Sequence, residues 1–201
     1  MKICVYGASS NYIDKIHLQQ VELLGEKMAE RGHSLVFGAG TNGCMGASAR
    51  GVHKHGGEII GIAPTFFNVD GVLFENCTKL IGTETMRERK QLLEDYSDAF
   101  IIAPGGVGTL DEFFEILTLK QLVRHKKAMA VFNVNGYYDE LLKFLETMVK
   151  GQFARPETLK LFEVFTDIDE MLDYIEKYKS PDFDVQDMKH IPSEPHEHTE
   201  D

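Results

Sequence analysis

Residues 99–112 read AFIIAPGGVGTLDE, and this stretch decides the fold. The apolar run 99–103 predicts a buried strand, and the FFEIL of residues 113–117 predicts that a helix follows the glycine turn. A strand, a turn and a helix in this order form half of a βαβ unit. Strands and helices alternate along the rest of the chain, so we predict an α/β, Rossmann-like fold: a doubly wound, mostly parallel sheet with helices on both faces.

The predicted elements make one domain over residues 1–180. Strands are expected at 2–6, 34–37, 58–62, 79–81, 99–103, 128–134 and 162–165, with 99–103 as the central strand. Helices are expected at 12–31, from the turn at 46 to 55, at 85–97, from 109 to 125, and at 137–150 and 167–178. Residues 181–201 hold three of the six prolines and carry seven acidic residues against one basic residue, which predicts a disordered acidic tail.

The glycine turn between the strand at 99–103 and its helix has the features of an anion site. Gly105, Gly106 and Gly108 carry no Cβ, so a ligand can approach the backbone. The first N–H groups of the helix have no internal partner and lie at the positive end of its dipole, which favours a phosphate. A second interpretation stays open, because Thr109 and Glu112 have the spacing of a capping box, in which Glu112 only bonds the N-cap amide.

Three motifs, in the same order, resemble those of the Lonely Guy (LOG) family of phosphoribohydrolases. Residues 104–112 resemble its Pro-Gly-Gly-x-Gly-Thr-x-x-Glu signature, and residues 86–90, MRERK, resemble its Met-x-x-Arg-Lys motif. The segment 38–46, GAGTNGCMG, is similar to Gly-Gly-Gly-x-x-Gly-Leu-Met-Gly, with Ala39 in place of the middle glycine. The similarity runs from about residue 2 to residue 150.

The resemblance implies an enzyme that hydrolyses the N-glycosidic bond of a nucleoside 5′-monophosphate, AMP or a cytokinin-type N6-substituted AMP. It implies no metal and no cofactor, and a homodimer with pockets near the subunit interface. It places Arg89 and Glu112 in catalysis. The expected substrate-binding residues are Lys90, Gly105, Gly106, Val107, Gly108, Thr109, Asp111 and Thr118. A family acid before the arginine motif aligns poorly, and Asp70 and Glu75 are both candidates. The region that contains them, residues 65–76, is expected to help shape the base pocket, so the base preference stays open.

The helix predicted at 85–97 places one cation toward the protein. Helical phase puts Arg89 on the face of Leu92 and Leu93, with Arg87 opposite in water and Lys90 intermediate. An inward guanidinium needs an anionic partner, either a ligand or a structural carboxylate. Thr85 and Glu88 also have the spacing of a capping box.

Other classes of protein remain as alternatives. A non-catalytic nucleotide or molybdenum-cofactor carrier would keep the phosphate loop without needing Arg89 and Glu112 together. A general purine or pyrimidine nucleotide nucleosidase would share all these residues. A dinucleotide site at Gly38-x-Gly40-x-x-Gly43 is disfavoured, since its acidic residue should end the next strand and Glu58 begins that strand.

Composition restricts the partners. The net charge of −11 argues against a nucleic-acid partner. No apolar run is long enough to predict a membrane span, and residues 1–7 are too short and strand-like for a signal peptide. Cys4, Cys44 and Cys77 show no metal spacing, and we expect Cys4 and Cys44 to be small buried side chains. Three unpaired cysteines suit a reducing compartment, so we expect a cytoplasmic protein.

Overall fold

The structure, a computed structural model, describes residues 1–67 and 71–181. Its sheet has the strand order β4-β3-β2-β1-β5-β6-β7, and every neighbouring pair is parallel. The strands are β1 (Lys2–Tyr6), β2 (Ser34–Phe37), β3 (Ile59–Pro64), β4 (Lys79–Thr83), β5 (Ala99–Ile102), β6 (Ala128–Phe132) and β7 (Glu163–Phe165). The predicted Rossmann-like α/β fold is confirmed. The predicted central strand is wrong, because β1 lies in the middle and β5 lies beside it; sequence order does not fix how many strands are added on each side.

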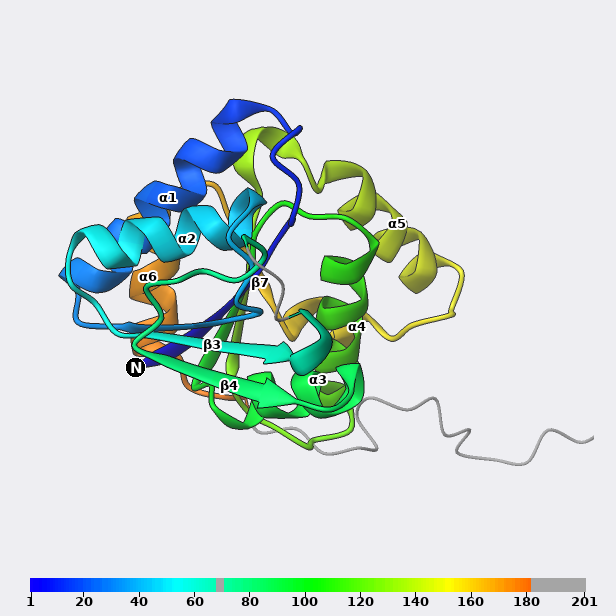
Figure 1. The fold of residues 1–201 in the computed structure, drawn as a ribbon. Coiled ribbons are helices and arrows are strands. Elements are labelled where there is room, and N and C mark those ends of the chain that lie inside the picture. Colours follow the sequence, from blue (N-terminus) through cyan, green and yellow to red (C-terminus); the bar gives the residue numbers. More distant parts are fainter. Residues whose placement is uncertain (68–70, 182–201) are drawn as a thin grey trace, which may run out of the picture.

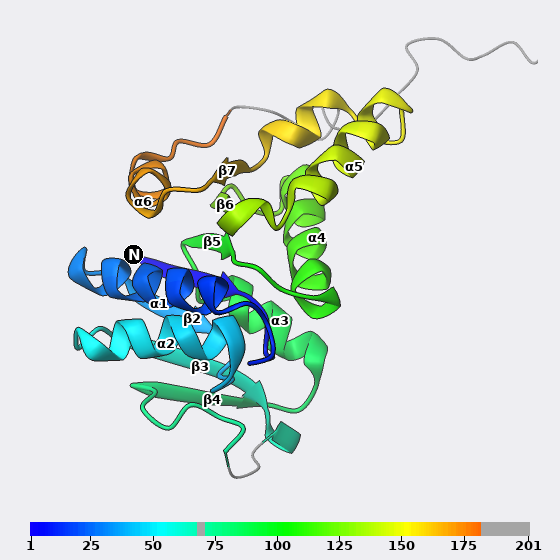
Figure 2. The same ribbon diagram turned by 90° about the horizontal axis from the view of Figure 1, so that it is seen from above.

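Helices cover both faces of the sheet (Figures 1 and 2). They are α1 (Lys15–Glu30), α2 (Gly43–Lys54), α3 (Met86–Asp95), α4 (Val107–Gln121), α5 (Asp139–Lys150) and α6 (Ile168–Lys177). Short 3₁₀ turns follow β3 (η1, Thr65–Phe67), β6 (η2, Val134–Gly136) and α5 (η3, Pro156–Lys160). Helix α1 begins later than predicted because Asp14 caps it, accepting a hydrogen bond from Ile16 N at 3.1 Å. Helix α4 ends four residues before the predicted end, and Val123 just beyond it has a φ of 55°.

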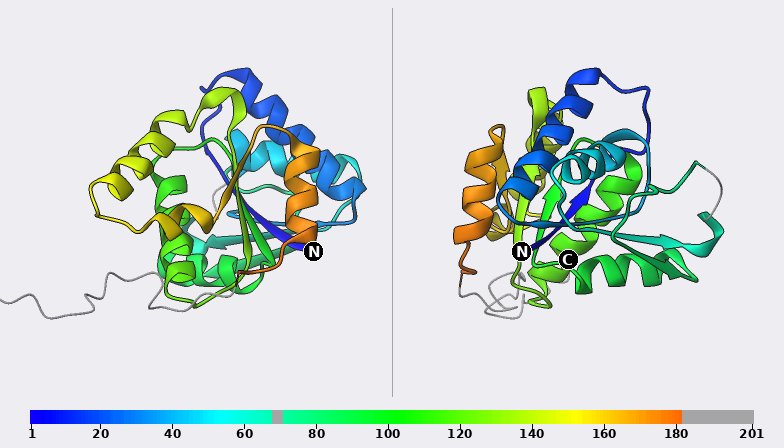
Figure 3. Two further views of the ribbon diagram at one scale, coloured as in Figure 1. Left: turned by 180° about the vertical axis from the view of Figure 1, so that it is seen from behind. Right: turned by 60° about the vertical axis from the view of Figure 1, so that its left-hand side comes forward.

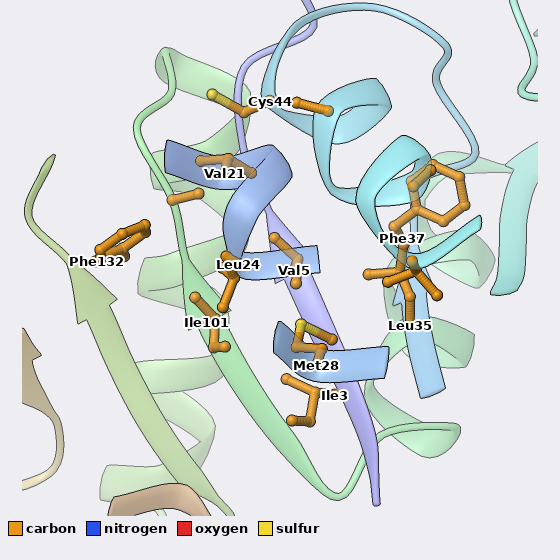
Figure 4. Close-up of a cluster of buried hydrophobic side chains, with 14 of the residues drawn as sticks. Ile3, Val5, Val21, Leu24, Met28, Leu35, Phe37, Cys44, Ile101 and Phe132 are labelled. Carbon is orange, nitrogen blue, oxygen red and sulfur yellow. The ribbon is translucent and has the colours of Figure 1, made fainter. Parts of the chain in front are cut away.

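Alternation along the strands divides the core into two layers. Ile3 and Val5 of β1 pack on the α1 side with Val21, Leu24 and Met28, where the side chains point toward one another (Figure 4). On the other face, a second buried cluster joins the intervening strand residues to α3, α4 and α5. Both faces of the central strands are therefore buried, which explains why their sequences are continuously apolar rather than alternating.

The last helix closes the layer that contains α1. Figure 3 shows α6 beside α1, and Arg31 at the end of α1 joins them through ion pairs to Asp169 at 2.8 Å and Asp173 at 2.7 Å. Cys4 and Cys44 are buried as predicted. Within residues 1–67 and 71–181, no helix is long and apolar enough to cross a membrane. The predicted tail lies outside the described residues, apart from Pro181.

The doubly wound topology brings several turns to one edge of the sheet. The chain adds β2, β3 and β4 on one side of β1 and then returns to place β5 on its other side. The turns that leave the carboxyl ends of β1, β2 and β5 are therefore neighbours, and the Ala8 amide donates a hydrogen bond to the Pro104 carbonyl at 3.0 Å. Ligands of such sheets bind at this edge, where the strand order reverses.

Candidate active site

The start of α4 faces this edge and exposes unpaired amides. Gly106 is the N-cap, and the first helical hydrogen bond runs from Leu110 N to Gly106 O at 3.0 Å. The amides of Val107, Gly108 and Thr109 precede that bond and have no acceptor within the helix. The capping-box interpretation is wrong: Thr109 lies inside the first turn, no side chain caps the helix, and Glu112 is bonded to another helix.

Gly106 and Gly108 are glycines that the protein's own packing does not require. A Cβ placed on either residue meets no atom of residues 1–67 and 71–181 within 4 Å, and neither has a positive φ. Each of the other glycines in the chain has a positive φ or would bring a Cβ within 4 Å of another atom. These two glycines therefore keep free the space in front of the helix N-terminus, where an anion binds most favourably.

Side chains of Thr109, Tyr137 and Tyr138 pack against or bond the backbone of residues 103–105, which precede α4. A Cβ on Gly105 would overlap the Thr109 hydroxyl, so this glycine serves the packing of the turn itself. The Tyr137 hydroxyl donates to Gly105 O, and the Tyr138 hydroxyl donates to Ala103 O, both at 2.8 Å. The Asn135-Gly136 turn, with φ angles of 52° and 72°, carries both tyrosines to this position. The two hydroxyls fix the backbone carbonyls on either side of Pro104, immediately before α4.

A buried ion pair lies beside the turn. Arg89 of α3 and Glu112 of α4 are 7% and 9% exposed, and Arg89 Nη1 donates to Glu112 Oε1 at 2.8 Å. The predicted inward orientation of Arg89 is confirmed, and Arg87 is exposed as predicted. Thr85 caps α3 by accepting from Glu88 N, while the Glu88 carboxylate accepts from Glu84 N rather than from the cap residue.

The arginine keeps unused hydrogen-bonding capacity. Its Nε is buried and has no partner among the described residues. A guanidinium has five N–H donors, and a buried donor without a partner is unfavourable. A ligand oxygen placed beside Arg89 would satisfy it.

Burial changes the protonation of Glu112. Removal from water raises the pKa of its carboxyl above the ordinary value, and the Arg89 guanidinium offsets part of this rise. The charged groups that affect it from α3 and α4 are Arg89, Lys90 and Asp111, while Cys4 and Tyr6 of β1 lie behind it. A carboxylate with a raised pKa is a stronger base when ionised, which suits general-base catalysis near neutral pH.

The turn and the ion pair line one pocket of about 370 Å³. Its polar lining comes from Ser9, Arg89, Lys90, Thr109, Asp111, Glu112 and the backbone of residues 106–108, and its apolar lining includes Met45, Phe67 and Met86. Lys90 bonds Asp111 at 3.1 Å and also contacts Glu115. The Val107 side chain is exposed at the mouth. Phe67 lies in the stretch 65–76 that the sequence analysis expects beside the base. Met45 and Met86 were not expected there, and their one signal was that they belong to two of the motifs.

Three described residues singled out from the sequence, Thr118, Ala39 and Glu75, do not line this pocket. Thr118 is exposed six residues beyond Glu112 and does not line it. Ala39 has a φ of 60°, and its methyl lies over Gly61 in the core, so it does not obstruct a ligand. Of the two candidate acids, Glu75 is exposed and does not line the pocket, and Asp70 lies outside the described residues.

A second pocket, of about 460 Å³, adjoins the first across Ala8, Ser9 and Gly106. It lies toward α1, with Asp14, His17 and Tyr137 in its lining. Over residues 1–67 and 71–181, no group of three or more His, Cys, Asp or Glu side chains is arranged to hold a metal ion.

Comparison with known proteins gives consistent results. The family model described as "possible lysine decarboxylase" matches residues 45–175. The chain is 34% identical over 188 residues to a probable cytokinin riboside 5′-monophosphate phosphoribohydrolase of Oryza sativa subsp. japonica, covering 94% of this chain and 76% of the relative. It is 33% identical over 178 residues to a cytokinin riboside 5′-monophosphate phosphoribohydrolase of Arabidopsis thaliana, covering 89% and 78%.

Solved structures show the same fold at lower identity. The molybdenum cofactor binding protein of Rippkaea orientalis superimposes with a TM-score of 0.68 at 21% identity, over 87% of this chain and 94% of that one. The Moco carrier protein of Chlamydomonas reinhardtii gives 0.67 at 22% identity, over 88% and 95%.

Proposed function

The chain belongs to the LOG family of phosphoribohydrolases, and on that premise we propose that it hydrolyses the N-glycosidic bond of a nucleoside 5′-monophosphate. The C1′–N bond breaks, the oxygen of water joins C1′, one proton of that water ends on the base, and the products are the free base and ribose 5-phosphate. The observation that carries this proposal is the position of a buried Arg89–Glu112 pair in the same pocket as an open helix N-terminus.

The 5′-phosphate binds in front of α4. The amides of Val107, Gly108 and Thr109 have no acceptor in the helix, and Gly106 and Gly108 leave the space before them empty. A single phosphate group fits the hydrogen-bonding capacity and the dipole of one helix N-terminus. The ammonium of Lys90 at the rim adds positive charge to a site that also contains Asp111.

The ribose then lies beside Glu112, one helical turn further along α4. Cleavage of an N-glycosidic bond gives C1′ oxocarbenium character, as in glycoside hydrolysis. The Glu112 carboxylate stabilises this charge and accepts a proton from the attacking water. Arg89 holds Glu112 at 2.8 Å, and its unpartnered Nε donates to a ribose or phosphate oxygen.

The base lies against Met45, Met86 and Phe67. Thioether and aromatic side chains attract a planar ring through dispersion and impose little hydrogen-bond selectivity. This wall would accept adenine and would also accept an apolar N6 substituent, as in a cytokinin riboside 5′-monophosphate. We therefore propose AMP and N6-substituted AMP as substrates.

A carrier that only binds its ligand is the second candidate, since the fold is shared with molybdenum-cofactor proteins. The likeness at 21–22% identity concerns the fold alone. The buried Arg89–Glu112 pair in the same pocket favours the hydrolase, because a protein that only stores a phosphorylated ligand needs no buried carboxylate beside the phosphate site.

The test is a panel of nucleoside 5′-monophosphates, each paired with its nucleoside, with free base scored by chromatography. We expect base release from AMP or N6-substituted AMP and far less from the nucleosides, because they lack the phosphate. Equal release from nucleotide and nucleoside would refute the phosphate site, and binding without release would favour the carrier.

A further inference from the structure

The glycines of segment 38–46 are required by packing within the protein, unlike Gly106 and Gly108 at the start of α4. A Cβ on Gly38 would overlap Nη2 of Arg89, and a Cβ on Gly40 would lie 2.9 Å from Cε of Met45. Gly43 has a φ of 61°, and Gly46 packs directly on the Thr41 carbonyl. Packing within the protein thus accounts for all four glycines, whereas Gly106 and Gly108 face open space.

We infer that Gly38 is a positioning residue: because it has no side chain, the guanidinium of Arg89 can lie against the carboxyl end of β2, from where it reaches Glu112. This inference deepens the proposed function and rests on it for the catalytic consequence. The effect of residue 38 on the position of Arg89 can be tested without measuring turnover.

Two side chains, Arg89 and Met45, lie against the position that a Cβ of residue 38 would take. Arg89 extends from α3 across the end of β2, where its Cζ is only 3.0 Å from the position that a Cβ of residue 38 would take. The sulfur of Met45 lies 3.2 Å from that same position, so the sulfur and the guanidinium both flank it. Nη1 then donates to Glu112 at the far end of the group. Any side chain at residue 38 would overlap Nη2 and so displace the guanidinium.

The effect of Gly38 on Glu112 should therefore pass through Arg89 alone. Arg89 lowers the pKa of Glu112 against the effect of burial, and displacing the guanidinium lets that pKa rise. The other titratable or charged groups around Glu112 are Lys90 on α3, Asp111 on α4, and Cys4 and Tyr6 on β1. None of these is among the nearest atoms to a Cβ at residue 38.

The chain offers a matched pair of variants. Gly38→Ala and Gly40→Ala make the same change in the same turn, and each meets first the mobile end of one side chain, Arg89 or Met45. Both variants should fold. Gly38→Ala should raise the pKa of Glu112, measured by NMR of carbon-13-labelled glutamate, and lower kcat about 100-fold, as a misplacement of about 1 Å can do. Gly40→Ala displaces Met45 instead of Arg89 and should keep the wild-type pKa of Glu112.

A second background separates a positioning role from a merely structural one. In an Arg89→Met protein, adding Gly38→Ala should not shift the pKa of Glu112 further, because the group that Gly38 seats is gone. An unchanged pKa of Glu112 in Gly38→Ala, or a further shift in the Arg89→Met background, would overturn the inference. If the wild-type protein hydrolyses no nucleoside monophosphate, the proposed function fails, and the pKa comparison still decides the role of Gly38.

Discussion

Replacing Gly108 by alanine should make the protein more stable and bind its ligand less tightly. Gly108 is the second residue of α4, and a Cβ there meets none of the described atoms within 4 Å. Glycine in a helix is less favourable than alanine by about 0.5–1 kcal/mol. The new methyl meets no obstacle, so the free energy of unfolding should rise by up to about 1 kcal/mol, which raises Tm by up to about 4 °C in a chain of this size.

The same methyl enters the space that we assign to the 5′-phosphate. It separates the ligand from the amides at the start of α4, and we expect Kd to increase at least about tenfold, or 1.4 kcal/mol. Thermal unfolding without ligand measures the first effect, and calorimetric titration with AMP measures the second. The titration is made in a Glu112→Gln background so that AMP is not consumed.

Gly105→Ala provides the contrast within the same turn. Its Cβ would overlap the Thr109 hydroxyl, so this variant should lower the free energy of unfolding by about 1–3 kcal/mol, the usual effect of overpacking. Wild-type affinity in Gly108→Ala would refute the phosphate assignment. A lower Tm in Gly108→Ala would show that the space before α4 is not open in the folded protein.

Three further outcomes follow from the described contacts. Arg89→Ala should lower turnover far more than Arg87→Ala, since only Arg89 contacts Glu112, and steady-state rates of both variants check this. Ala39→Gly should leave turnover near wild type and change the free energy of unfolding by less than about 1 kcal/mol in chemical denaturation, because relief of a positive φ offsets the lost methyl burial. Burial lowers the pKa of Lys120 to about 8, so between pH 8 and 10.5 the unfolded chain binds more protons than the folded protein and the unfolding free energy rises with pH. The unfolding free energy of the wild type should rise by up to about 3 kcal/mol over this range, and the Lys120→Met variant should lack this rise. Parallel pH curves for the two proteins would contradict the prediction.

The fold could be predicted from the sequence because each strand and helix has its own local sequence pattern. Continuous apolar strands, alternating with helical patterns, indicate a parallel sheet covered on both faces. Helix ends were less accessible. The start of α1 depends on the Asp14 side chain, and the end of α4 depends on the φ of Val123, neither of which apolar periodicity encodes.

The sequence predicted the parts of the site in which the phase of a single helix determines the direction of a side chain. Helical phase was enough to place Arg89 inward and Arg87 in water. The sequence left open whether Arg89 positions Glu112 or binds a ligand, since the spacing of Thr109 and Glu112 also suits a cap. Only the crossing of α3 and α4 shows that Arg89 lies 2.8 Å from Glu112. For the same reason the sequence alone could not separate a glycine that seats a side chain from one that faces a ligand.

The rate of base release by Glu112→Gln tests the account most directly. Glutamine keeps the shape of the side chain and an oxygen that can accept from Arg89 Nη1, so the protein should fold and bind nucleotide. An amide neither accepts the proton of water nor balances an oxocarbenium charge, and loss of a general base lowers rates by about 10²–10⁴. We predict AMP binding close to wild type with base release at least about 100-fold slower. Turnover near the wild-type rate would contradict the account, because the chemistry would then have to lie elsewhere than at Glu112.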